Sequence, residues 1–291
     1  MLILLACIFL NSLIVVVFKL FDKYNVDNLQ AIVTNYFVCV ITAGFFIGSF
    51  PIPSDIYNLP WFWYAVSLGV IFALSFNILA LTVQNFGIVI ATIFQKMSLV
   101  APALFAIFVF GESSGIMKWI GIGASLFAIG LLGYNNDKQI KSNKTQNALV
   151  YLFPIFTFLC SCLIDSGLYY IDVSGLVTGG KIEFVASLFF FAGVSGLLFL
   201  IYRIIKGDSK LNLKSVFAGV LLGIPNFFSI YLLLLALNQG WGGSVVFPLN
   251  NVGVLVLASL YGFLLFKEKL SAVKIIGIIL SLFAIYCISQ S

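Results

Sequence analysis

The sequence contains no histidine and few charged residues, which make up only 9% of its 291 positions. Without histidine, the chain has no histidine proton relay, no His-x-x-x-His metal site and no Ser-His-Asp triad. Cysteine is also scarce. All five cysteines lie in apolar stretches, and only Cys160 and Cys162 are close together. Neither a disulfide framework nor a zinc site is therefore predicted.

Long apolar runs dominate the chain instead. Apolar residues make up 62% of the sequence and the mean hydropathy is +1.15, which is typical of integral membrane proteins. A helix needs about 20 apolar residues to cross the hydrocarbon core. Ten such segments occur, at 2–21, 29–49, 60–82, 88–110, 116–134, 148–170, 182–205, 213–237, 243–266 and 272–289. We therefore expect an all-α membrane protein with ten transmembrane helices.

Glycines recur at the small-xxx-small spacing that allows two membrane helices to approach closely. The pairs are Gly44/Gly48, Gly175/Gly179 and Gly219/Gly223. We interpret all three as helix-packing positions.

The second half of the sequence repeats the first. Lys118 to Leu131 (KWIGIGASLFAIGL) and Lys274 to Cys287 (KIIGIILSLFAIYC) are identical at nine of fourteen positions, with a constant offset of 156. A Phe-x-Glu segment precedes both copies at the same offset and ends at Glu112 and at Glu268. Duplicated membrane transporters have this kind of internal similarity.

The most polar stretch of the chain, 135–147 (NNDKQIKSNKTQN), lies between the fifth and sixth apolar segments. It predicts a linker between two five-helix repeats, 1–134 and 148–291. Because five is odd, equivalent helices of the two repeats cross the membrane in opposite directions, so we expect inverted repeats. Twelve of the fifteen lysine and arginine residues follow odd-numbered segments. This bias predicts a cytoplasmic linker and both termini outside.

These features together resemble the drug/metabolite transporter superfamily, and in particular its EamA branch of ten-span transporters. The resemblance covers the whole chain. It rests on the five-plus-five duplication, on the glutamates after segments four and nine, and on the Ile-Gly-Ile that opens segments five and ten. It implies alternating access, with a substrate site near the midplane lined mainly by spans one, three, four, six, eight and nine. Members are often drawn with both termini in the cytoplasm, whereas the charge bias here predicts the opposite.

One departure from the superfamily concerns the first span. Its four-span multidrug relatives carry a proton-coupled glutamate eight residues before a lysine. The matching stretch here runs from Asn11 to Lys19 and has an asparagine at the carboxylate position. Exchange of protons for drugs through that residue is therefore not expected.

Lys96 lies near the middle of the fourth predicted span. A lysine at this depth costs about 2.5–3.5 kcal/mol on insertion scales, so it should face protein or water. One interpretation is that Lys96 attracts an anionic group of the substrate, a carboxylate or a phosphate. The other is an ion pair with Asp165 or Glu183, whose net stabilisation would be small. The sequence leaves both open.

The repeat places further polar side chains at a similar depth. Aligned through Phe94 and Phe247, Gln95 and Lys96 fall just before the level of Asn250–Asn251, so charge is present in one copy only. Prolines in these two spans free backbone carbonyls, which indicates either a lined cavity or a simple kink. The predicted substrate-binding residues are Asn11, Asn77, Gln95, Lys96, Asp165, Asn226, Asn250 and Asn251.

Two of these predictions carry alternatives. Each asparagine, taken singly, is better explained as an interhelical hydrogen bond than as a ligand contact, whereas the asparagines as a set favour a binding site. Asp165 is the candidate for proton coupling, or a hydrated residue near the end of its span. Outside the spans, Glu112 and Glu268 are expected to stabilise the starts of the helices that follow them.

The predicted function is a secondary transporter of a small polar or amphipathic, amino-acid-like metabolite, working as an exporter. The alternative is a lipid or lipid-linked sugar translocase, which would need a lateral opening and a phosphate site at Lys96. A non-transporting membrane scaffold is a further alternative. We do not expect an enzyme, because no set of reacting groups can be named.

The expected partners are a small-molecule substrate, the lipid bilayer, and a proton or sodium ion as candidate coupling ion. Neither a cofactor nor nucleic acid is expected. The predicted location is the plasma (inner) membrane of a bacterium, with multiple passes.

Overall fold

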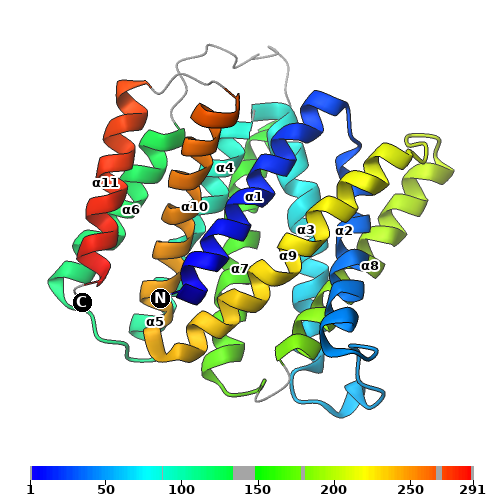
Figure 1. Ribbon diagram of the computed structural model, residues 1–291, viewed down its shortest axis with the longest axis horizontal. Coiled ribbons are helices and arrows are strands. Elements are labelled where there is room, and N and C mark those ends of the chain that lie inside the picture. Colours follow the sequence, from blue (N-terminus) through cyan, green and yellow to red (C-terminus); the bar gives the residue numbers. More distant parts are fainter. Residues whose placement is uncertain (1, 87, 134–147, 178–180, 267–270, 290–291) are drawn as a thin grey trace. The chain divides into compact units, whose positions relative to one another are not determined.

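The computed structural model describes all residues except 1, 87, 134–147, 178–180, 267–270 and 290–291 (Figure 1). Within this part, every regular element is helical. The predicted linker 135–147 and Glu268 lie outside the described residues. The longer helices are α1 (Leu2–Tyr24), α2 (Asn28–Ile47), α3 (Phe62–Phe86), α4 (Ile88–Lys96), α5 (Val100–Phe108), α6 (Ile116–Gly133), α7 (Leu152–Val173), α8 (Lys181–Ile205), α9 (Leu213–Ala236), α10 (Gly243–Phe266) and α11 (Ala272–Ser289).

Helices occupy all ten predicted segments, with ends that differ by a few residues. Among the described residues, six helical segments are long and apolar enough to cross a membrane: Asn28–Ile47, Phe62–Leu79, Leu152–Val173, Lys181–Ile205, Leu213–Gly240 and Gly243–Leu265. Four shorter apolar segments accompany them: Leu2–Phe18, Ile93–Phe108, Ile116–Leu132 and Ala272–Ile288. The protein is an all-α membrane protein.

The fourth predicted segment, 88–110, is not one continuous helix. A 3₁₀ turn, Met97–Leu99, separates α4 from α5 directly after Lys96. Pro102 lies at the third position of α5. Proline lacks an N–H group, so it cannot bond the carbonyl four residues earlier, and the chain tightens before it.

The chain forms two compact units. Unit 1 comprises residues 1–76 and 170–238, and unit 2 comprises residues 77–169 and 239–291. Each unit therefore combines segments from both halves of the sequence. The predicted repeats, 1–134 and 148–291, describe the sequence and stay a prediction.

Unit 1 is built on α2, which packs against both α8 and α9, while α1 packs against α9. Gly223 of α9 faces α2 so closely that an added Cβ would lie 2.6 Å from the Cβ of Val38. Lipid gives little hydrophobic drive for helix association, so close backbone approach at small residues stabilises the pair instead. The packing role predicted for Gly219/Gly223 is confirmed.

Two glycines of the other pairs, Gly48 and Gly175, do not act in this way. Gly48 caps the C-terminus of α2 in the left-handed conformation (φ +73°), and its N–H donates to the Gly44 carbonyl at 2.9 Å. Gly175 also has a positive φ (+64°) and follows the end of α7. The prediction was wrong for Gly48 and Gly175, because spacing alone does not distinguish a packing glycine from a turn glycine. Gly179 lies outside the described residues.

Unit 2 contains an antiparallel pair formed by α6 and α11, which lie side by side in Figure 1. Gly121 near the start of α6 lies against Ile288 near the end of α11. Gly277 near the start of α11 lies against Leu132 near the end of α6. A core of aliphatic side chains from α5, α6 and α10 completes the unit, including Ala103, Ile129 and Val252.

Candidate functional site

Lys96 ends α4 at the helix break and is half-buried. Its ammonium donates a hydrogen bond to the side-chain carbonyl oxygen of Asn251 on α10, at 3.2 Å. Asn251 and its neighbour Asn250 are 5% and 6% exposed. The repeat alignment predicts polar groups of the two spans at a similar depth, and the hydrogen bond brings the Lys96 and Asn251 side chains together.

Asp165 of α7 lies in the same region of unit 2. The hydroxyl of Ser98, in the turn between α4 and α5, donates to the Asp165 carboxylate at 2.8 Å. Asp165 also interacts electrostatically with Lys96. We call Lys96, Ser98, Asp165 and Asn251 the polar cluster. It contains a cation, an anion, a hydroxyl and an amide within helices that consist mainly of apolar residues.

Three other predicted binding residues belong to unit 2. Two of them lie on helices that contribute to the polar cluster, and the third lies on α3, the helix before α4 in the sequence. Gln95 is next to Lys96 on α4, Asn250 is buried on α10, and Asn77 is half-buried on α3. Glu183, the other predicted ion-pair partner of Lys96, belongs to unit 1.

Asn11 and Asn226 belong to a polar network in unit 1. The amide of Asn226 on α9 donates to the side-chain oxygen of Asn35 on α2 at 3.2 Å. The amide of Asn11 on α1 donates to the Cys7 sulfur at 3.4 Å, and the Cys7 thiol donates to the backbone carbonyl of Ser229 on α9 at 3.2 Å. These contacts connect α1 and α2 to α9, as expected for interhelical hydrogen bonds.

Sequence reasoning missed Asn35 and Ser98. Asn35 is fully buried, and its amide nitrogen has no hydrogen-bond partner among the described residues. A signal was present for both, because each is a polar residue inside a predicted span. Ser98 in particular lies two residues from Lys96.

Glu112 forms a second polar centre in unit 2, outside the spans. Its carboxylate accepts hydrogen bonds from the backbone N–H groups of Gly243 at 2.7 Å and Ser244 at 3.2 Å, from the Tyr169 hydroxyl at 2.6 Å, and from the Ser244 hydroxyl. The Lys118 ammonium donates to the same serine hydroxyl at 2.9 Å. We call Glu112, Tyr169, Gly243 and Ser244 the Glu112 latch.

These hydrogen bonds show that the role predicted for Glu112 was wrong. The carboxylate caps the N-terminus of α10 rather than that of α6, the helix that follows it in sequence. Partial burial acts to raise the pKa of Glu112, but hydrogen bonds from Ser244 and Tyr169 and from two backbone N–H groups outweigh it, so the pKa is lowered. Glycine is required here, because a Cβ on Gly243 would lie 2.6 Å from the Tyr169 ring.

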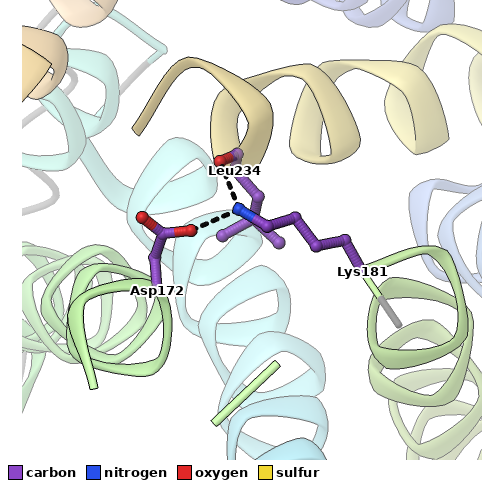
Figure 2. Close-up of polar contacts among 3 residues, drawn as sticks. All are labelled: Asp172, Lys181 and Leu234. Atoms are coloured by element: carbon purple, nitrogen blue, oxygen red, sulfur yellow. Dashed lines mark hydrogen bonds and ion pairs between the residues drawn. The ribbon is translucent and has the colours of Figure 1, made fainter. Parts of the chain in front are cut away.

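In unit 1, an ion pair joins the ends of three helices (Figure 2). The Lys181 ammonium, at the start of α8, lies 2.5 Å from a carboxylate oxygen of Asp172 near the end of α7. It also donates to the backbone carbonyl of Leu234 near the end of α9, at 3.0 Å. The two charged side chains are only 12% and 8% exposed. The pair therefore holds α7, α8 and α9 together at one end.

These arrangements can bind charged and polar groups of a ligand, but they do not resemble a metal centre. Among the residues that the structure describes, no group of three or more cysteine, aspartate and glutamate side chains could hold a metal ion. The polar cluster is the candidate functional site, because its opposite charges, Lys96 and Asp165, lie inside the predicted spans, whereas Asp172 and Lys181 lie at helix ends.

The fold and this site define the protein as an all-helical membrane protein with charged groups buried among its helices. No family model matches the chain. An uncharacterized protein of Haemophilus influenzae is 30% identical over 284 residues, which cover 94% of this chain and 92% of that protein. The chain belongs to the same family as this Haemophilus protein.

One solved crystal structure of a protein matches 99% of this chain and 96% of its own chain, with a TM-score of 0.76. The sequence identity is 14%. At this identity, the likeness shows a shared fold alone.

Proposed function

We propose that this protein is a ten-span secondary transporter that exports a small polar or amphipathic, amino-acid-like metabolite from a bacterial cell. The observation that carries the proposal is the polar cluster. An ammonium and a carboxylate within apolar helices are costly, and such groups mark substrate or ion pathways in membrane proteins. Lys96 would bind an anionic group of the substrate, and Asp165 would bind a cationic group or a coupling proton.

The helix pairings support an inverted duplication. At the sequence offset of 156, Gly121 corresponds to Gly277 and Leu132 to Ile288. The contact of Gly121 with Ile288 and that of Gly277 with Leu132 are therefore equivalent under exchange of the repeats. Such reciprocal contacts are what a two-fold axis produces, and an antiparallel pair related in this way matches an inverted repeat.

Other pairings follow the same rule. In the proposed ten-span arrangement, α2 and α8 are the second span of each repeat, and α5 and α10 belong to the fourth. Each of these pairs is also in contact. The five-plus-five arrangement is that of the EamA branch of the drug/metabolite transporter superfamily, which the sequence resembles. We propose membership of that superfamily, with alternating access as the mechanism and the bacterial inner membrane as the location.

The test is transport by the purified protein in liposomes, measured as exchange of radiolabelled amino acids across the membrane. We expect Lys96→Gln and Asp165→Asn to abolish exchange while the proteins stay folded. Lys214→Gln removes an exposed lysine in the first turn of α9 and is the matched control, which should exchange like wild type. If no amino acid is exchanged, or if Lys96→Gln exchanges as fast as wild type, the proposed function is wrong.

A further inference from the structure

We infer that the ligand of the polar cluster is a short zwitterionic amphipath, whose charged end binds at the cluster and whose apolar chain lies in a groove between α5 and α7. The inference rests on the proposed function and names its substrate class. It is carried by the cavity beside the cluster and by the two opposite charges within it.

The groove is a cavity of about 570 Å³ in unit 2. Small-molecule sites in proteins have volumes of about 300–1,000 Å³ and are lined mainly by apolar groups. This cavity has such a lining, which includes Ala101 and Phe105 of α5 and Leu159, Cys162, Leu163 and Ser166 of α7.

The groove adjoins the polar cluster on both walls. On α7, Asp165 directly precedes the lining residue Ser166. On the other wall, Ser98 lies three residues, about one helical turn, before Ala101. The hydrogen bond from Ser98 to Asp165 therefore joins the two walls beside the groove. A ligand with its polar end at Asp165 has an apolar surface next to it.

The charges of the cluster select for a ligand that carries both signs. Lys96 can bind a carboxylate and Asp165 can bind an ammonium, and the two side chains interact electrostatically with each other. A ligand with one charge would compensate one of them and repel the other, and uncompensated charge is costly at membrane depth. A zwitterion compensates both.

The length of the groove favours a short single chain over a membrane phospholipid. Its α7 wall, Leu159 to Ser166, covers seven residue steps, or about 10 Å at 1.5 Å per residue. A lipid acyl chain spans half of the hydrocarbon core, about 15 Å. The groove therefore fits an apolar chain that is shorter than a lipid tail.

The test uses the full-length protein in nanodiscs of one defined phospholipid, with binding measured by titration calorimetry. The probes are straight-chain α-amino acids of increasing length: 2-aminobutyrate, norvaline, norleucine and 2-aminooctanoate. Each added methylene that leaves water should tighten binding about threefold to fourfold. Hexylamine and hexanoate, which each lack one charge, should bind about tenfold more weakly than norleucine.

A matched pair of variants separates the groove from the rest of α7. Leu159 lines the groove and Phe156 does not, yet both are 45% exposed. Leu159→Trp should fill the groove, remove the dependence on chain length and weaken the binding of norleucine and 2-aminooctanoate most. Phe156→Trp should behave like wild type in every titration.

The outcomes distinguish the inference from the proposed function. If the affinity is independent of chain length while Lys96→Gln still abolishes binding, the inference is wrong and the proposed function stands. If Leu159→Trp keeps the wild-type length dependence, or if a diacyl phospholipid binds in preference to the whole series, the inference is also wrong. If no zwitterion binds and no exchange occurs in liposomes, both are wrong.

Discussion

Removing the Glu112 carboxylate should destabilise unit 2 substantially, because four donors converge on it. Loss of an N-terminal cap costs about 1 kcal/mol. The hydroxyls of Tyr169 and Ser244 also lose their hydrogen bonds to the charged carboxylate. Each of these losses adds about 1.5 kcal/mol, at the lower end of the range for hydrogen bonds to charged groups. The sum is about 4 kcal/mol. Water can reach the half-buried carboxylate and replace part of these bonds, so we expect Glu112→Ala to lose about 3 kcal/mol.

The measurement is the free energy of unfolding in mixed micelles, obtained by titration with sodium dodecyl sulfate and followed by tryptophan fluorescence. Tyr169→Phe removes one of the four hydrogen bonds and should lose about 1.5 kcal/mol. Asp55→Ala removes an exposed carboxylate in a loop and should change stability by less than about 0.5 kcal/mol. A loss in Glu112→Ala no larger than that in Asp55→Ala would refute the reasoning.

Four further predictions concern the pH dependence of stability, the Lys181–Asp172 ion pair, the packing of Gly223 and the orientation in the membrane. Because the pKa of Glu112 is lowered in the folded state, its stabilisation is fully present above the unfolded-state value of about 4.3 and is lost as the pH falls through the lower folded-state value. The free energy of unfolding should therefore fall between neutral and acidic pH more steeply in wild type than in Glu112→Gln. Lys181→Met leaves the Asp172 carboxylate buried without its partner and should cost about 3–5 kcal/mol, whereas an additional Asp172→Leu should recover most of that loss. Gly223→Ala should destabilise the protein by about 1–3 kcal/mol, because the new methyl group overlaps Val38, and Val38→Ala should restore part of the stability in the same unfolding assay. A periplasmic reporter fused to the C-terminus should be active and a cytoplasmic reporter inactive; the reverse result would contradict the charge-based orientation.

The positions of the helices could be predicted from the sequence because lipid imposes a simple requirement. Every backbone polar group in the hydrocarbon must bond within its own segment, so an apolar run of sufficient length must be a helix. The predicted segment 243–266 coincides with α10, and 213–237 differs from α9 by one residue. The break after Lys96 agrees with the irregular backbone that the proline of this span predicted, because proline interrupts the hydrogen-bond ladder of a helix.

The candidate site was predictable in part. Lys96, Asp165 and Asn251 were identified because charged or amide side chains are rare in membrane spans. Their partners were less accessible to sequence reasoning. Ser98 contacts Asp165 across 67 positions of the chain, and a serine in a span carries no cost large enough to make it conspicuous. Glu112 was assigned to α6 because a cap was sought in its own neighbourhood, whereas its partners on α10 lie more than 130 positions away.

The sequence by itself determined that this is a membrane protein of apolar helices with an internal repeat, because composition and periodicity act locally and hydrocarbon tolerates no other backbone. Only the tertiary structure decided which helices pack together and which polar side chains are in contact. The pairing of Lys96 with Asn251, of Ser98 with Asp165 and of Lys181 with Asp172 depends on helix contacts and side-chain directions. A hydropathy pattern gives the length and depth of a helix, but not the face that it turns toward its neighbours.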